Sequence, residues 1–368
     1  MLLVLQRKST KALRMEKHAT GISAGTLRSV GQLPPFKLLS GGSVKYRSGC
    51  SVRLRRQCVL MWAVATSSVN QNLRSARPEN VPGEFFVDHT CIDCDTCRWM
   101  APKVFTQAGE KSAVQHQPVS ENERVAALQA LLSCPTSSIH TIEPPPDILQ
   151  IQATFPLPID LERLPGVYHC GFHSKKSFGA ASYIITRSDG NILVDSPRYT
   201  EPLARRLEEL GGVRYMFLSH KDDIADHARW QKRFHCDRIL HKEEVQPDTA
   251  DVEIKLEGGG LWNIGLDIDL IFTPGHTEGC VSLLYKPLRA LFTGDHLAAS
   301  SEGGLSIHRD YNWYSVKLQI DSTRSLLPMD FVWVLPGHGR RLKFKDINEK
   351  NEAIKNLIDV EEAIQTKP

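Results

Sequence analysis

The sequence lacks any long apolar run: no segment approaches the roughly 18 consecutive apolar residues that a membrane-spanning helix needs. Acidic residues are nearly absent from positions 1–78, where Glu16 stands alone among five Lys and nine Arg. That segment carries a net charge of +13, so the remaining residues carry −10 of the chain's total of +3. We therefore expect no membrane span, and an acidic body whose main partner is not nucleic acid.

Residues 1–78 are basic, rich in Ser and Thr and poor in acids, a composition typical of an organelle transit peptide. The basic residues are not massed into a block, which disfavours the alternative of a nucleic-acid-binding arm. We predict a disordered transit peptide that is cleaved between Arg56 and Pro78. The apolar and basic start, Met1 to Arg7, would suit a mitochondrion, and a chloroplast address is the other possibility.

The 368 residues and their 41% hydrophobic content suggest two soluble domains behind this leader. Residues 82–143 form a small module, in which a helix is predicted over 121–132. Three consecutive prolines, Pro144 to Pro146, begin a stiff linker over 144–165. From residue 166 to 368 the pattern changes to strands and helices, with a hairpin at 183–195, a helix at 201–210 and a closing helix at 347–365.

The nine cysteines are odd in number and unevenly spaced, which argues for metal binding rather than a disulfide framework. Cys91, Cys94 and Cys97 stand three residues apart, and Cys134 precedes a proline. The other cysteines inside apolar segments are expected to be buried structural thiols, and these are Cys170, Cys236 and Cys280.

This cysteine pattern resembles the single-cluster bacterial-type [4Fe–4S] ferredoxins, whose ligands are a C-x-x-C-x-x-C run and a distant Cys-Pro. The resemblance implies that Cys91, Cys94, Cys97 and Cys134 hold one [4Fe–4S] cluster in a small α+β domain. Ala101-Pro102 stands where a second-cluster ligand would be, so only one cluster can form. The alternatives are a zinc site, which usually shows two separated C-x-x-C pairs, and a module without a cluster.

Histidines and aspartates follow several apolar runs in the C-terminal half. Asp195 ends an Ile-Leu-Val strand, and His220, His276, Asp295 and His338 follow further runs. Because an apolar run that ends in Gly, His and Asp is typical of a buried strand opening into a loop, these side chains are expected to meet at one sheet edge. Neutral imidazoles and carboxylates there can hold one or two divalent ions and leave a position for water.

Residues 166–368 resemble the metallo-β-lactamase superfamily, whose motifs run H-x-H-x-D-H, a Pro-Gly-His, a Thr-Gly-Asp and a final Gly-His. The resemblance implies a four-layer αβ/βα sandwich of two mixed sheets with helices outside, and it favours the chloroplast stroma for the location. The first motif departs from the family. Five residues separate His220 from Asp226, where the family has three, and Asp222 takes the second-histidine position. Counted from the back, that position is Ile224.

The resemblance implies two metal ions, zinc or iron. His220, Asp222 and His276 are assigned to the first ion and Asp226, His227 and His338 to the second, with Asp295 between them. Asp226 and His338 are also the expected catalytic residues. Replacing a histidine with Asp222 favours iron or manganese, and the flavodiiron proteins of this superfamily carry an acidic residue there too.

Three functions fit this reading. The first is a hydrolase, in which metal-bound hydroxide attacks an ester, thioester or lactone of a small molecule. The second is a diiron oxidoreductase that receives electrons from the cluster, with a redox partner protein. The third is a non-enzymatic iron–sulfur carrier or scaffold with a decayed hydrolase domain. The chain lacks both a following flavodoxin-like domain and the long helical extension of glyoxalase II.

Several other polar and aromatic residues have simpler explanations. Asp195 is interpreted as a structural brace, and Asp223 either as a partner of a ligand or as a solvated acid. His296 should point away from the metals if its strand alternates. Tyr311, Trp313 and Tyr314 could wall a substrate pocket or pack in the core. The remaining isolated histidines are expected to be ordinary surface or core residues: His169, His173, His241 and His308.

Overall fold

The computed structural model of the protein describes residues 73–365, all of which belong to one compact unit. Most of the predicted transit peptide lies outside these residues, so its plastid address stays a prediction. Residues 73–78 are an exception, because Arg77 is buried and its guanidinium donates to the Ala108 carbonyl at 2.9 Å. Residues 73–78 thus pack with the folded module. Between residues 73 and 365, no helix is long and apolar enough to cross a membrane.

Residues 73–152, called the cysteine module below, contain two small antiparallel pairs and three helices. The core of the module holds Phe85, Phe105 and Leu128. The predicted helix is confirmed as α3, whose N-cap Ser120 accepts the backbone N–H of Glu123. The elements are β1 (Phe85–Val87), α2 (Thr96–Met100), β2 (Phe105–Ala108), β3 (Lys111–Val114), α3 (Glu121–Ser133), β4 (Ile139–Thr141) and α4 (Ile148–Gln152), with β1 paired to β4 and β2 to β3.

The predicted linker over 144–165 is not a free spacer. Ile151 of α4 is buried in the core of the cysteine module. Leu157–Pro158 forms β5, which pairs antiparallel with β6, and Leu164 joins the core of the sandwich. The apolar residues after the proline run therefore fasten this segment to both domains, because leaving them in water would forfeit their burial free energy.

The rest of the chain forms two mixed sheets. The seven-stranded sheet has the order β11-β10-β9-β8-β7-β6-β5, and the six-stranded sheet has the order β12-β13-β14-β15-β18-β19. The strands of the first sheet are β5 (Leu157–Pro158), β6 (Val167–His169), β7 (Tyr183–Ile185), β8 (Ile192–Val194), β9 (Tyr215–Phe217), β10 (Asp237–His241) and β11 (Ile254–Leu256). Those of the second are β12 (Leu261–Ile264), β13 (Ile268–Phe272), β14 (Val281–Tyr285), β15 (Ala290–Gly294), β18 (Trp333–Pro336) and β19 (Leu342–Lys343).

The two sheets face each other across a shared core that includes Phe217 from one and Phe292 from the other. Along β8, Ile192 and Val194 point into this core, while Leu193 joins the outer cluster with the helices. That alternation is the period of two that a strand imposes. A small antiparallel hairpin, β16 (Ala298–Ala299) with β17 (Leu305–Ser306), forms a separate two-stranded sheet that is bridged to Arg340 through Ala299.

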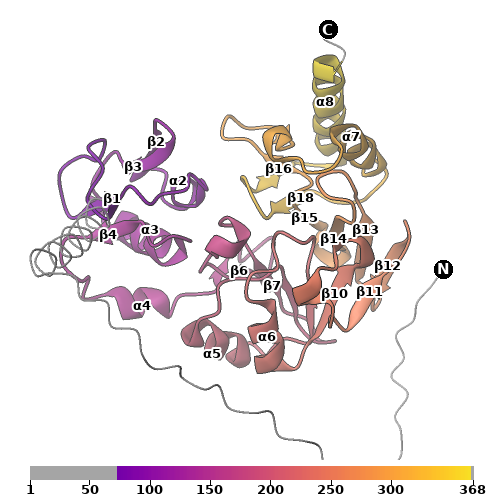
Figure 1. Ribbon diagram of the computed structural model, residues 1–368, viewed down its shortest axis with the longest axis horizontal. Helices are drawn as coiled ribbons and strands as arrows, with labels where there is room; N and C mark the ends of the chain where they lie inside the picture. Colours follow the sequence, from indigo (N-terminus) through magenta and orange to yellow (C-terminus); the bar gives the residue numbers. More distant parts are fainter. Residues whose placement is uncertain (1–72, 366–368) are drawn as a thin grey trace, which may run out of the picture. The chain divides into compact units, whose positions relative to one another are not determined.

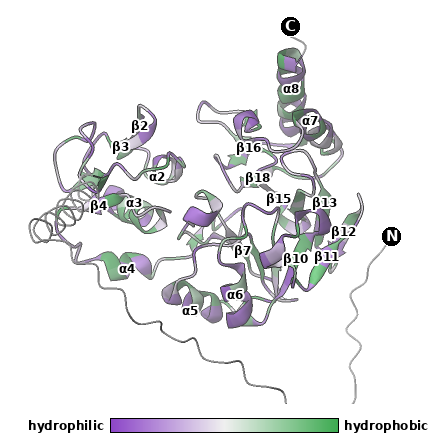
Figure 2. Cartoon of the chain, in the orientation of Figure 1, coloured by the Kyte–Doolittle hydropathy of each residue, from purple (hydrophilic) through white to green (hydrophobic). Residues whose placement is uncertain are grey.

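Helices cover the outer faces of both sheets. The first pair, α5 (Glu201–Glu209) and α6 (His227–Phe234), packs on the seven-stranded sheet through an apolar cluster. The second pair, α7 (Val316–Ser325) and α8 (Ile347–Gln365), packs on the six-stranded sheet (Figure 1). Figure 2 shows these helices striped by hydrophilic and hydrophobic residues, as one-sided burial requires. The four-layer αβ/βα sandwich predicted from the sequence is confirmed.

Candidate metal centre

The polar residues of the site follow the ends of strands in both sheets. His220 comes three residues after β9, His276 follows β13, Asp295 follows β15 and His338 follows β18. The strands β8 and β9 are parallel, as are β15 and β18, so each pair ends at one edge of its sheet. Facing sheets bring these edges together. The expected meeting of distant His and Asp residues is what the structure shows.

Four donor atoms lie near one another, contributed by the loop after β9, the loop after β13 and the end of β15. His220 Nε2 lies 3.9 Å from Asp222 Oδ2 and 3.8 Å from Asp295 Oδ2. His276 Nε2 lies 3.8 Å and 3.7 Å from the same two oxygens. A tetrahedral ion with bonds of about 2.1 Å separates its ligand atoms by about 3.4 Å. Each imidazole nitrogen therefore lies slightly farther from the two carboxylate oxygens than two ligands of one cation would, and His220, Asp222 and His276 group together as possible ligands of one ion.

Asp223 is completely buried in this site. The sequence allowed two interpretations of this residue, as a partner of a ligand or as a solvated acid. Neither of its carboxylate oxygens has a hydrogen-bond partner among the described residues, and it groups with His220 and Asp295 as possible ligands. Burial, together with Asp295 and Asp195, raises its pKa well above the usual range. Burying an acid without a partner is costly, and a cation would offset that cost. We therefore assign Asp223 to the metal centre.

His338 lies on the other side of Asp295. Its Nδ1 is 2.9 Å and 2.8 Å from the two oxygens of that carboxylate, and its Nε2 has no partner within residues 73–365. Asp295 thus faces three imidazoles, as expected of a residue between two ions. The unpartnered atoms of His220, Asp222, Asp223, His276 and His338 fit bound metal, since buried polar atoms are otherwise nearly always hydrogen-bonded.

A hydrogen-bond relay orients the His220 ring. Asp195 accepts the backbone N–H of Ser219 at 2.8 Å and its hydroxyl at 3.1 Å, and Ser219 Oγ lies 3.0 Å from His220 Nδ1. Because the hydroxyl proton goes to Asp195, Ser219 Oγ accepts the Nδ1 proton, which leaves the Nε2 lone pair for a cation. Asp195 is therefore the structural brace that the sequence predicts.

Glu244 holds two of the ligand loops together, although no sequence pattern indicates this role. The buried carboxylate accepts the backbone N–H of Lys221 at 2.8 Å and that of Gly279 at 2.5 Å. Lys221 stands between His220 and Asp222, and Gly279 follows His276 by three residues. Glu244 therefore fixes the loop after β9 against the loop after β13.

The structure does not bring Asp226 and His227 to this site. The Asp226 carboxylate lies 2.8 Å from Lys176 Nζ and accepts the backbone N–H of Tyr199 at 2.9 Å. The guanidinium of Arg238 lies 3.1 Å from Nδ1 of His227, whose pKa burial and Arg238 lower. Asp226 is the N-cap of α6, whose first residue is His227, and both side chains have these other partners instead of the ligand cluster. The geometry therefore supports Asp222, and not Ile224, at the second-histidine position of the motif.

The remaining candidates lie outside the ligand cluster. His296 faces α7, with Nε2 at 3.2 Å from Thr323 Oγ1, as alternation predicts. Tyr311, Trp313 and Tyr314 are exposed rather than packed in a core, although the Trp313 backbone N–H donates to the His276 carbonyl at 3.0 Å. The other isolated histidines are buried or nearly so: His169, His173, His241 and His308.

The four clustered cysteines are all free thiols in the cysteine module. Backbone N–H groups point at two of the sulfurs, from Ser138 to Cys134 Sγ at 3.2 Å and from Ser112 to Cys91 Sγ at 3.5 Å. Burial, together with the neighbouring thiols Cys134 and Cys91, raises the pKa of Cys94 to about 11. A coordinated metal stabilises the buried thiolate and so removes the free-energy cost of ionising it. The residues therefore fit an iron–sulfur cluster. Cys170, Cys236 and Cys280 are buried, as predicted.

Comparison with known proteins identifies both parts of the chain. Residues 87–141 match the family described as the 4Fe-4S single cluster domain of Ferredoxin I, and residues 177–338 match the Metallo-beta-lactamase superfamily. The match to the single-cluster family supports the [4Fe–4S] reading of the cysteine pattern over zinc.

The curated relatives are hydrolases by name. A hydroxyacylglutathione hydrolase of Rhodopseudomonas palustris (strain HaA2) is 30% identical over 108 residues, 28% of this chain and 42% of that protein. The probable metallo-hydrolase YybB of Bacillus subtilis (strain 168) is 23% identical over 194 residues, 47% of this chain and 87% of that protein. The chain thus spans less than half the length of the hydroxyacylglutathione hydrolases that it matches.

Among solved structures, the BLEG-1 B3 metallo-β-lactamase has a TM-score of 0.42 and 20% identity, covering 50% of this chain and 96% of that one. The metallo-β-lactamase superfamily protein ST1585 from Sulfolobus tokodaii has a TM-score of 0.39 and 16% identity, covering 55% of this chain and 87% of that one. The two family matches thus show a metallo-β-lactamase superfamily domain over residues 177–338, preceded by a 4Fe-4S single cluster domain over residues 87–141.

Proposed function

We propose that this protein is a metal-dependent hydrolase of a small ester or thioester that carries an anionic group. The observation that carries the proposal is that the Nε2 atoms of His220 and His276 each lie 3.7 to 3.9 Å from a carboxylate oxygen of both Asp222 and Asp295. The relatives named as hydroxyacylglutathione hydrolases and as a metallo-hydrolase support the same reaction class.

The ligand set defines what the protein itself contributes. When bound, divalent ions acidify water and polarise a carbonyl oxygen, which is the chemistry of hydrolysis near neutral pH. His220 and His276 would hold the first ion with Asp222, and Asp295 would stand between it and a second ion near Asp223 and His338. Two carboxylates beside two imidazoles suit iron or manganese as well as zinc.

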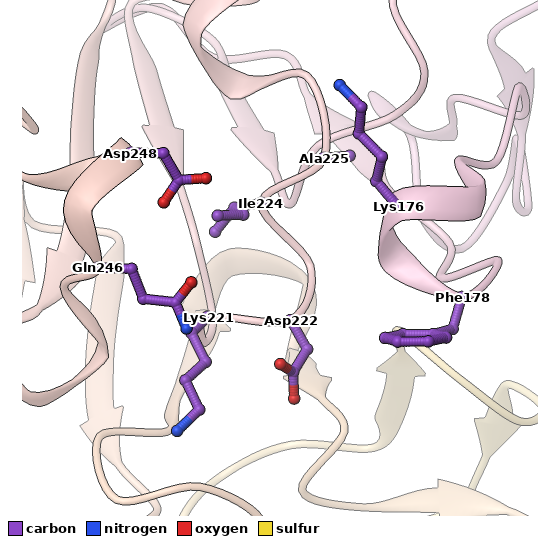
Figure 3. A pocket seen from close by; sticks show the side chains of 8 residues that line it. All are labelled: Lys176, Phe178, Lys221, Asp222, Ile224, Ala225, Gln246 and Asp248. Atoms are coloured by element: carbon purple, nitrogen blue, oxygen red, sulfur yellow. The ribbon is translucent and has the colours of Figure 1, made fainter.

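A pocket adjoins this ligand set and shares Asp222 with it (Figure 3). The cavity has a volume of about 250 Å³, and Figure 3 shows Asp222 between Lys221 and Phe178. Its other lining residues are Lys176, Ile224, Ala225, Gln246 and Asp248. Lys176 is paired with Asp226, whereas the Lys221 ammonium has no ion-pair partner in the described part of the chain. Lys221 can therefore pair with an anionic group of the substrate.

The substrate class gives a first prediction. Replacing Lys221 with Ala should raise KM for a carboxylate-bearing thioester about tenfold and leave kcat within twofold, because the ammonium binds substrate and transition state alike. The measurement is steady-state hydrolysis of acyl thioesters and esters, with and without a carboxylate, by full-length protein loaded with Zn²⁺, Mn²⁺ or Fe²⁺.

Lys317→Ala, which removes an exposed lysine on α7, is the matched control and should change neither constant. A tenfold rise in KM for neutral substrates as well would contradict an anion-binding role for Lys221. If no ester or thioester is hydrolysed with any of the three metals, the hydrolase proposal is wrong and the scaffold function gains support.

A one-electron redox function is the second candidate. It is favoured by the carboxylate-rich ligand set and by the packing of the cluster ligand Cys94 against Gly179, next to the pocket residue Phe178. Metal analysis separates the two functions, because two zinc ions per chain would leave no redox metal in the sandwich.

A further inference from the structure

We propose that the cysteine module positions the loop that carries His338, so that loss of the [4Fe–4S] cluster weakens metal binding in the sandwich. The proposal rests on the metal centre described above, but it does not require that the bound metal catalyse hydrolysis. Residues 338–341 are called the His338 loop. Three sets of contacts join this loop, directly or through one intervening segment, to the residues between the cluster cysteines.

The first contact is an ion pair. Asp95 lies between the cluster ligands Cys94 and Cys97, and Arg340 follows His338 by two residues. Arg340 Nε donates to Asp95 Oδ2 at 3.1 Å, and Nη2 lies 3.5 Å from Oδ1. Both side chains are partly buried, so the pair is less screened by solvent than one on an open surface. It ties the cysteine loop directly to the His338 loop.

The second contact is aromatic. The guanidinium of Arg341 lies over the ring of Trp99 in α2, 4.5 Å from its centre, and 5.4 Å from the ring centre of Tyr183 in β7. Arg341 Nε and Nη2 have no hydrogen-bond partner in the described chain, so contact with the aromatic rings contributes to holding this cation. Trp99 follows Cys97 by two residues, so its position depends on how the cysteine loop is folded.

The third set of contacts runs through residues 173–181. A Cβ on Gly179 would lie 2.8 Å from Cys94 Cβ and 3.2 Å from its Sγ, so the cluster ligand packs directly on this glycine. Thr96 Oγ1 lies 3.0 Å from His173 Nδ1, which also lies 2.7 Å from the Gly179 carbonyl. At the other end, the backbone N–H of Ala181 donates to the Gly337 carbonyl at 2.7 Å.

All three sets of contacts depend on the cluster, because it fixes the residues that make them. A bound cluster fixes Cys94 and Cys97, and with them Asp95, Thr96 and Trp99. Without it, the loop that presents these partners loses its coordinate bonds, and the His338 loop loses the surface that orients it. Residues that orient a metal ligand from outside the coordination sphere typically change metal affinity 10- to 100-fold when removed. We therefore expect the weaker end of that range, about tenfold, for loss of the cluster.

The test is Mn²⁺ binding to the full chain, followed by electron paramagnetic resonance of the free ion. Mn²⁺ prefers carboxylate and imidazole to thiolate, so vacated cysteines do not compete for it. We compare cluster-loaded protein, protein stripped of its cluster, and cluster-loaded Arg340→Gln. The stripped protein and Arg340→Gln should each bind Mn²⁺ about tenfold more weakly than the loaded wild type. Arg340→Gln should keep its iron and sulfide, which separates loss of the ion pair from unfolding of the module.

Arg309→Gln is the matched control, because the Arg309 side chain pairs with Glu361 of α8 and not with Asp95. It should bind Mn²⁺ like the wild type. Equal affinity in loaded, stripped and Arg340→Gln protein would overturn the proposal, and so would the absence of Mn²⁺ binding in every form. A tenfold difference in a protein that hydrolyses nothing would support the positioning role and refute only the hydrolase function.

Discussion

Replacing Asp295 with Asn is expected to remove bound metal from the sandwich and to lower kcat/KM by about 10³-fold, equivalent to about 4 kcal/mol of transition-state stabilisation. The reason is the central place of this carboxylate. Its Oδ2 lies 3.8 Å from His220 Nε2, 3.7 Å from His276 Nε2 and 2.8 Å from His338 Nδ1. An amide cannot supply the negative charge that holds two cations close together. Elemental analysis and steady-state kinetics on the same preparation measure both effects.

Asp330→Asn is a suitable control for this substitution, because Asp330 is exposed and pairs only with Arg289 in the described structure. It should retain full metal content and activity. If Asp295→Asn kept both as well, Asp295 would not lie between the ions, and the site built around it would be wrong.

Replacing Gly337 with Ala is expected to weaken metal binding by about 100-fold without unfolding the domain. A Cβ at this position would lie 2.6 Å from Asp223 Oδ2 and 2.9 Å from Asp295 Oδ1, so the methyl group would enter the space where the two carboxylates converge. Gly337 has no left-handed backbone conformation, so the substitution adds little backbone strain. Displaced ligands, rather than lost stability, should account for the effect. Metal affinity by chelator competition, with thermal unfolding of the metal-free protein, distinguishes the two.

Gly259→Ala provides the comparison, since its Cβ would make only an ordinary contact, 3.6 Å from the Phe272 ring. Its metal affinity should match the wild type. A Gly337→Ala protein that bound metal normally would show that Asp223 does not contribute to the centre.

The sequence was sufficient to predict most of the fold and four of the residues that meet at the site: His220, His276, Asp295 and His338. Apolar runs that end in Gly, His or Asp place His276, Asp295 and His338 at strand ends, because a buried strand and its polar loop have distinct compositions. The closing helix, Ile347–Gln365, agrees with the structure residue for residue. Such features depend on the order of apolar and polar residues within short segments, which a single sequence shows directly.

The first histidine motif could not be resolved in the same way. Asp222, Asp223, Asp226 and His227 are all suitable ligand types, and an irregular loop has no period that reveals which side chains turn inward. The partners that hold His227 and Asp226 elsewhere, Arg238 and Lys176, lie 11 and 50 residues away along the chain. The roles of Glu244 and Arg340 could not be predicted either, because they depend on contacts between loops that are distant in sequence.

The number of metal ions per chain in Asp223→Asn and Asp226→Asn tests the ligand assignment most directly. Both variants remove one carboxylate charge from the same loop, three residues apart. We predict that Asp226→Asn retains the metal content of the wild type and that Asp223→Asn loses at least one ion per chain, measured by elemental analysis after desalting. The reverse result, with metal lost from Asp226→Asn and kept in Asp223→Asn, would contradict the metal centre described for this protein.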